Sequence, residues 1–164
     1  MESRETRKIL ENFFAAMDRG DGDAIFAALS PSVVFEIRRN EWNSVVDYVG
    51  TYTGLDAVAG AFQVRGETTE PLGSELRELV VEGSTAYARL WDKAVHSRTQ
   101  VPFEVEVCHR LELDEQGRIA LWNVYFDPTP EIASFGADAS ELLLAAVRQG
   151  DKEAIATHLG HGAD

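Results

Sequence analysis

Residues 103–127 read FEVEVCHRLELDEQGRIALWNVYFD, and their pattern predicts the centre of a β-sheet. Apolar and polar side chains alternate before the segment Asp114–Gly117, and a run rich in apolar and aromatic residues follows it. Alternation with a period of two is typical of a half-buried β-strand, and a short Asp- and Gly-containing segment between two such runs is typical of a hairpin. The stretch therefore predicts two antiparallel strands, Phe103–Leu113 and Arg118–Asp127.

The residues upstream extend this hairpin into a larger sheet and supply the helices that cover it. Three further segments read as strands: Val33–Arg38, Glu75–Val81 and Ala86–His96. Apolar residues at helical spacing predict three helices: one capped by Ser3 and ended at Gly20, then Ala24–Leu29 and Leu55–Val64. Helices followed by an antiparallel meander predict an α+β fold, with N-terminal helices packed on one face of a mainly antiparallel sheet.

The composition limits the partners of the chain. Its 164 residues include 15 Lys and Arg against 28 Asp and Glu, which gives a formal net charge of −13. Such a charge repels phosphate backbones and anionic headgroups, so neither nucleic acid nor membrane is expected as a partner. The longest aliphatic run, Leu142–Val147, is far shorter than the roughly 20 residues of a membrane span. We expect a cytoplasmic protein.

The C-terminal residues differ in pattern from the rest, which divides the chain into residues 1–135 and 136–164. Ala139–Asp164 reads as two short helices joined at Gly150-Asp151, and its sequence resembles one ankyrin-type helix pair. A single pair of this kind cannot bury its own apolar face. It must therefore pack on the first domain, pair with another subunit or be the point where a longer protein was cut, and it offers a surface for a protein partner.

Strand faces follow from the register of the hairpins. Four-residue loops at Asp114–Gly117 and Arg98–Val101 set His109 opposite both Trp122 and Leu90, and Asp92 opposite Val107. The residues of one face are then apolar except for three: Asp92, His96 and His109. Cys108 falls on the opposite face. Because it is the only cysteine, neither an intrachain disulfide nor a cysteine-built zinc site is expected.

Asp92 and His109 are the candidate catalytic residues. In this register they lie diagonally on neighbouring strands, with roughly 5–8 Å between their Cβ atoms. A carboxylate beside an imidazole fixes its tautomer and raises its basicity, which suits a general acid or base. A buried Asp–His hydrogen bond with a structural role explains the same pair. The expected substrate-binding residues are Trp122, Phe126, Val107, Val124, Leu90 and Tyr52. No ligand spacing demands a metal, and no organic cofactor is expected.

The order of elements resembles the nuclear transport factor two-like superfamily, which includes ketosteroid isomerases, SnoaL-like polyketide cyclases and limonene-epoxide hydrolases. The resemblance rests on Arg19-Gly20-Asp21, Pro31-Ser32-Val33-Val34-Phe35, Tyr52-Thr53-Gly54, Gly117-Arg118-Ile119 and Tyr125-Phe126-Asp127-Pro128. It implies a cone-shaped α+β fold, a small-molecule site inside the cone and a homodimer formed through the other face of the sheet.

The catalytic residues of these relatives do not recur intact. The last strand is similar to the limonene-epoxide-hydrolase signature Trp-Arg-Asp-Tyr-Phe-Asp, but Asn123 and Val124 stand at its arginine and aspartate. The base of ketosteroid isomerases falls near Ile37, and their oxyanion-binding aspartate falls on or beside His109. A histidine there can still donate a hydrogen bond.

Two functions follow as hypotheses. The first is a cofactor-independent acid–base enzyme of isomerase, cyclase or dehydratase type, acting on a hydrophobic small molecule, with His109 as acid–base group or hydrogen-bond donor and Asp92 orienting it. The alternative is a non-catalytic module for small-molecule binding or protein assembly, which the missing family residues and the C-terminal helix pair favour.

Overall fold

The computed structural model describes residues 2–40 and 43–135, so the predicted helix pair at 136–164 lies outside the described residues. Four helices and six strands make up this part of the chain. The helices are α1 (Ser3–Arg19), α2 (Gly22–Ala27), α3 (Leu55–Thr68) and α4 (Thr129–Ser134). The strands are β1 (Leu29–Ile37), β2 (Gly50–Thr53), β3 (Thr69–Glu82), β4 (Thr85–His96), β5 (Pro102–Leu113) and β6 (Ile119–Phe126).

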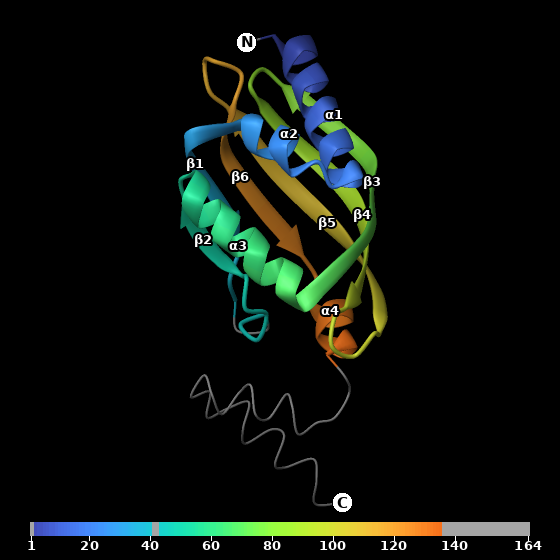
Figure 1. Ribbon diagram of the computed structural model, residues 1–164. Helices are drawn as coiled ribbons and strands as arrows, with labels where there is room; N and C mark the ends of the chain where they lie inside the picture. The colour runs from blue at the N-terminus through green and yellow to red at the C-terminus, as the bar shows by residue number, and fades with distance from the viewer. Residues whose placement is uncertain (1, 41–42, 136–164) are drawn as a thin grey trace, which may run out of the picture.

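The six strands form one sheet in the order β2-β1-β6-β5-β4-β3. Every neighbouring pair is antiparallel except β1 and β6, which run parallel. Figure 1 shows the sheet curving behind α1, α2 and α3, while α4 lies at one end of it. The predicted α+β class, with N-terminal helices on one face of a curved and mainly antiparallel sheet, is confirmed.

The first helix begins and ends for different reasons. Glu2 is the N-cap residue and makes no side-chain cap, so the predicted cap at Ser3 is wrong. The Ser3 hydroxyl instead accepts a hydrogen bond from the backbone N–H of Gly83, 2.9 Å away. The helix ends at Gly20, whose left-handed φ of 66° is open to glycine without penalty. The Asp21 side chain then caps α2 by accepting from Ala24 N.

Several elements are longer than their sequence pattern predicts. β1 starts at Leu29 rather than Val33, α3 extends to Thr68, and β3 starts at Thr69 rather than Glu75. The segment 40–53, which has no clear periodicity, contains the short strand β2. Hydrogen bonding to a neighbouring strand supports such residues where their own sequence pattern does not, because sheet formation depends on tertiary context.

The register between strands differs from the predicted one by two residues. Leu90 pairs with Val107, Asp92 pairs with Val105, and Val124 rather than Trp122 pairs with His109. The β4–β5 turn lies one residue earlier than expected and closes through Gln100, which adopts a φ of 58°. In the β5–β6 pair, Leu113 lies opposite Ile119 rather than Arg118, and the register shift between Glu112 and Leu113 adds one more residue, so the pairing beyond it is displaced by two. An even shift leaves every side chain on its predicted face.

The outer face of the sheet carries charged pairs between neighbouring strands. Lys93 lies 3.1 Å from Glu104, and Arg89 lies 2.8 Å from Glu106. In the register predicted from the loops Lys93 would face Glu106, and the displacement by two residues pairs it with Glu104 instead. Cys108 is exposed on this face, as predicted. Within the described residues no helix is long and apolar enough to span a membrane.

Candidate functional site

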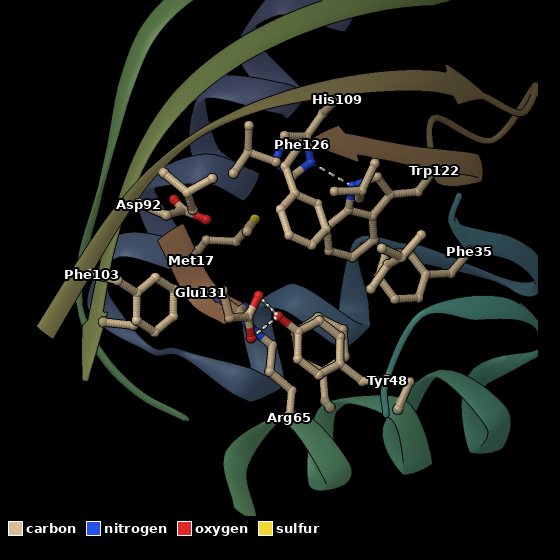
Figure 2. Close-up of a pocket in the computed structure, with 17 residues that line it drawn as sticks. Met17, Phe35, Tyr48, Arg65, Asp92, Phe103, His109, Trp122, Phe126 and Glu131 are labelled. Carbon is tan, nitrogen blue, oxygen red and sulfur yellow. Dashed lines mark hydrogen bonds between the residues drawn. The ribbon is translucent and has the colours of Figure 1, made fainter. Parts of the chain in front are cut away.

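A cavity lies between the concave face of the sheet and the helices (Figure 2). It offers about 60 Å³ to the centres of water-sized molecules, several times the roughly 10–15 Å³ that one ordered water needs. Most of its lining is apolar or aromatic: Met17, Phe35, Ile37, Ala61, Phe62, Ala94, Phe103, Val105, Val107, Trp122, Val124 and Phe126. Five polar or ionisable side chains complete the lining: Tyr48, Arg65, Asp92, His109 and Glu131.

His109 is held in one tautomer by Trp122. The indole Nε1–H of Trp122 donates a 2.7 Å hydrogen bond to Nδ1 of His109, so the imidazole proton belongs on Nε2. That Nε2 atom is buried and has no hydrogen-bond partner among the described residues. Burial, with Arg65 nearby, lowers the pKa of His109 to about 3, so the ring is neutral at physiological pH. His109 is therefore a neutral hydrogen-bond donor whose own donor group is unused.

Asp92 lies on β4, on another part of the cavity wall. One carboxylate oxygen accepts a 2.5 Å hydrogen bond from the Ser74 hydroxyl on β3. Burial raises the pKa of Asp92 above its usual value, while the Ser74 hydrogen bond acts in the opposite direction. A carboxylate held by one oxygen and poorly solvated has the properties of a general base.

Tyr48, Glu131 and Arg65 form a second polar cluster. The Tyr48 hydroxyl lies 2.6 Å from both carboxylate oxygens of Glu131. Arg65 reaches from α3 and its guanidinium carbon lies 5.9 Å from the centre of the Tyr48 ring. Figure 2 shows the three side chains converging at one side of the cavity, apart from His109. Burial raises the pKa of Glu131 and raises that of Tyr48 well above its ordinary value.

The structure separates the two residues that the sequence predicts to lie side by side. Asp92 pairs with Val105, four residues along β5 from His109, which is roughly 14 Å along the strand direction. Trp122, and not Asp92, orients His109. The predicted diagonal contact is wrong because the register is displaced by two residues. Both side chains nevertheless face the same cavity, since an even shift conserves faces.

The predicted substrate-binding residues fall into two groups. Trp122, Phe126, Val107 and Val124 line the cavity, and their role in binding stays a prediction. Leu90 is buried in the core and is not part of the cavity lining. Tyr52 is not part of it either, and its hydroxyl donates to the backbone oxygen of Tyr48, 3.0 Å away. Tyr52 thus supports a lining residue from behind.

Glu131, Arg65 and Tyr48 are not among the site residues that the sequence predicts. These three residues are far apart in the chain, on α4, on α3 and in the segment before β2. The sequence contains one signal for Glu131: the short helix that carries it directly follows the last strand, whose residues line the cavity. Within residues 2–40 and 43–135, no group of three or more His, Cys, Asp or Glu side chains could hold a metal ion.

The chemistry of this arrangement is that of proton transfer. It combines a poorly solvated carboxyl group at Asp92, an unused neutral donor at His109 and a second buried carboxyl group at Glu131. A base that removes a proton and a donor that stabilises the oxyanion formed are the two groups that enolisation next to a carbonyl requires. The aromatic walls suit the hydrophobic part of a small molecule.

Solved structures with the same fold carry varied descriptions. An NTF2-like protein of unknown function from Burkholderia pseudomallei is 18% identical, with a TM-score of 0.72 over 81% of this chain and 98% of that one. An LEH-like epoxide hydrolase from M. tuberculosis is 21% identical, with a TM-score of 0.60 over 80% and 90% of the two chains. A Catenulispora acidiphila protein with a ketosteroid isomerase-like fold, in complex with trimethylamine, is 13% identical, with a TM-score of 0.63 over 77% and 90%.

These identities are low, so the similarities concern the fold alone. Among curated protein sequences, none matches this chain significantly. The sequence itself matches the family model of the SnoaL-like domain over residues 10–122, which includes β1 to β5, most of α1 and the first part of β6. The chain therefore belongs to the SnoaL-like domain family.

Proposed function

We propose that this protein is a cofactor-independent acid–base enzyme that binds a hydrophobic, uncharged carbonyl compound in the cavity and moves a proton on the carbon next to that carbonyl. One observation carries the proposal: the Nε2–H of His109 is buried at an apolar cavity without a hydrogen-bond partner among the described residues. A buried donor left unsatisfied costs about 1–3 kcal/mol, and a carbonyl oxygen of a ligand would satisfy it.

In this mechanism the Asp92 carboxylate takes the proton from the carbon next to the carbonyl. The electron pair of the C–H bond moves to the carbonyl oxygen, and the oxyanion that forms accepts the hydrogen bond of His109 Nε2–H. A neutral imidazole suits this role because the Trp122 hydrogen bond keeps its proton on Nε2. Return of the proton from Asp92 to the same or a neighbouring carbon gives exchange or isomerisation.

The charge of the site supports an uncharged ligand. Asp92, when it is ionised, places a negative charge in the lining, and Arg65 lies beside the Tyr48 ring. A ligand with a carboxylate would add a second negative charge next to Asp92 in a poorly solvated space, and like charges there repel strongly. The hydrophobic walls and the net charge of −13 also disfavour a negatively charged ligand.

The test is proton exchange, which requires no knowledge of the natural substrate. 2-Tetralone and 4-phenylbutan-2-one are incubated with the protein in D₂O, and loss of the protons next to the carbonyl is followed by NMR. We expect exchange above the buffer rate, reduced about 100-fold by Asp92→Asn and by His109→Gln. Glu104→Gln, on the outer face of the sheet, is the matched control and should exchange like the wild type.

The non-catalytic alternative has its own support. Asn123, at the position of a catalytic arginine in epoxide hydrolases, makes structural hydrogen bonds here: it donates to Glu36 at 2.7 Å and accepts from Arg110 at 3.2 Å. Saturable binding of these ketones without any exchange would favour a small-molecule-binding module and contradict the enzyme proposal. Homodimer formation through the outer face stays a proposal that light scattering at micromolar concentration tests directly.

A further inference from the structure

The cavity holds a second carboxyl group for which enolisation has no use. An enzyme that only moves a proton between neighbouring carbons can take and return it with one carboxylate. Glu131 lies on α4, with its own partners Tyr48 and Arg65, whereas Asp92 lies on β4 with Ser74. Burying a carboxyl group is costly, so a second one calls for an explanation.

We propose that Glu131 is the general acid of an elimination reaction, and that the substrates are therefore β-hydroxy carbonyl compounds that lose water in this cavity. The inference rests on the proposed function, because the same Asp92 and His109 form the enolate from which the hydroxyl group departs. A second proton donor is what such a step requires, since hydroxide is a poor leaving group unless it is protonated.

The surroundings of Glu131 suit the role of proton donor. Its side chain is buried, with 1% of its surface exposed, and burial raises its pKa, while the Tyr48 hydrogen bond and Arg65 act in the opposite direction. The Tyr48 hydroxyl keeps its own proton, because burial and the neighbouring Glu131 make tyrosinate unfavourable. Tyr48 therefore donates a hydrogen bond to the Glu131 carboxyl group and positions it. Arg65 stabilises the carboxylate left after proton transfer.

The proton balance closes without an outside reagent. The C–H bond next to the carbonyl breaks and its proton goes to Asp92. The enolate then collapses: the oxyanion re-forms the C=O bond and the enolate electron pair forms a C=C bond to the β-carbon. The C–O bond to the β-hydroxyl group breaks in the same step, and the oxygen takes the electron pair of that bond and the proton of Glu131, leaving as water. Asp92 gives its proton to solvent and Glu131 takes one up, which restores the starting state. The overall reaction converts a β-hydroxy carbonyl compound into an α,β-unsaturated one and water.

The competing explanation is that Glu131 and Tyr48 only fasten α4 to the rest of the domain. Hydrogen bonds that do not involve the cavity also fasten this helix. The Thr99 hydroxyl donates to the backbone oxygen of Ser134 at 2.5 Å, and the rings of His96 and Phe135 are in contact at an angle of 46°, with centres 5.0 Å apart. Thr99→Val is therefore the matched control, because it loosens α4 without changing a residue of the lining.

The probe pair is 4-hydroxy-4-phenylbutan-2-one and its analogue without the hydroxyl group, 4-phenylbutan-2-one. Dehydration of the first is followed by the absorbance of the conjugated product, and proton exchange of the second by NMR. We expect Glu131→Gln to lower the ratio of dehydration to exchange about 100-fold. Tyr48→Phe should lower the same ratio by a smaller factor, and Thr99→Val should leave the ratio as in the wild type.

Each outcome decides something different. Exchange without dehydration in the wild type overturns the role of Glu131 and leaves the proposed function standing. If dehydration falls equally in Thr99→Val and Glu131→Gln, Glu131 acts only by fastening α4. This outcome also overturns the proposal. Absence of both reactions in the wild type overturns the proposed function and this inference together. The melting temperature of each variant, measured in parallel, identifies any variant that fails to fold, and Tyr48→Phe then takes the place of Glu131→Gln.

Discussion

The indole Nε1–H of Trp122 donates a 2.7 Å hydrogen bond to Nδ1 of His109 in the buried wall of the cavity. The two rings are near-parallel, with an interplanar angle of 25° and centres 5.9 Å apart. A histidine that accepts at Nδ1 carries its proton at Nε2, so Trp122 determines which atom His109 offers to a ligand. An aromatic side chain thereby does what the sequence assigns to Asp92.

Replacing Trp122 with Phe should release this tautomer and destabilise the fold. The substitution removes the donor of a buried hydrogen bond and leaves a gap beside Phe13, whose ring centre lies 5.1 Å from that of Trp122. We expect a loss of about 2–4 kcal/mol in the free energy of unfolding, measured by urea denaturation. Nitrogen-15 shifts of His109 should show both tautomers in place of one. Trp91→Phe, at the partly exposed outer face, is the control and should lose less than about 1 kcal/mol.

His109 should stay neutral to low pH, and this makes stability depend on pH. Its pKa is about 3 in the folded state against about 6.5 unfolded, so the unfolded chain takes up a proton below pH 6.5 and the folded protein does not. The stability from the neutral ring is complete above pH 6.5 and is lost as the pH falls. The difference in unfolding free energy between the wild type and His109→Gln should shrink by about 2 kcal/mol from pH 7.5 to pH 5. A ring titration with a midpoint near 6.5 would contradict this.

Asp92→Asn should stabilise the protein while it reduces proton exchange about 100-fold. The folded-state pKa of Asp92 is raised by burial, so the ionised carboxylate weakens the fold above that pKa and the neutral form does not. We expect the melting temperature of the variant to exceed that of the wild type at pH 8, with the gap closing near pH 4. The melting temperature of Glu104→Gln should instead lie below that of the wild type at pH 8, because the hydrogen bond from Lys93 lowers the pKa of Glu104. Equal melting curves at pH 8 would contradict the assigned burial of Asp92.

Gly54→Ala should destabilise the junction between β2 and α3. Gly54 has a φ of 85°, which side-chain-bearing residues rarely adopt, and its N–H donates to the backbone oxygen of Val33 at 2.8 Å. We expect a loss of about 1–3 kcal/mol, measured by thermal or urea unfolding. Gly60→Ala is the control within α3, where an added Cβ meets no atom within 4 Å and the substitution should stabilise the helix by about 0.5–1 kcal/mol.

The sequence predicts the fold well where its periodicity is strong. Alternation over β4, β5 and β6 identifies these strands and their buried faces, and the apolar spacing of α1 identifies the helix that covers them. Segments without such a pattern are the ones predicted poorly, namely β2 and the first residues of β1 and β3. Their pairing partners come from distant parts of the chain, and a local pattern contains no information about those.

In the candidate site, too, the sequence predicts what depends on periodicity and does not predict what depends on contacts between distant residues. Period-two alternation alone determines that Asp92 and His109 share the concave face, because no even error in register can move a side chain to the other face. The contacts between these side chains depend on turn length and on the register shift in the β5–β6 pairing. As a result, His109 is hydrogen-bonded to Trp122 and does not contact Asp92 as expected. Tyr48, Arg65 and Glu131 meet only because three distant elements close over one cavity. The α+β class and the face of each strand residue therefore follow from the local sequence pattern, whereas the partners of the ionisable groups follow from tertiary packing.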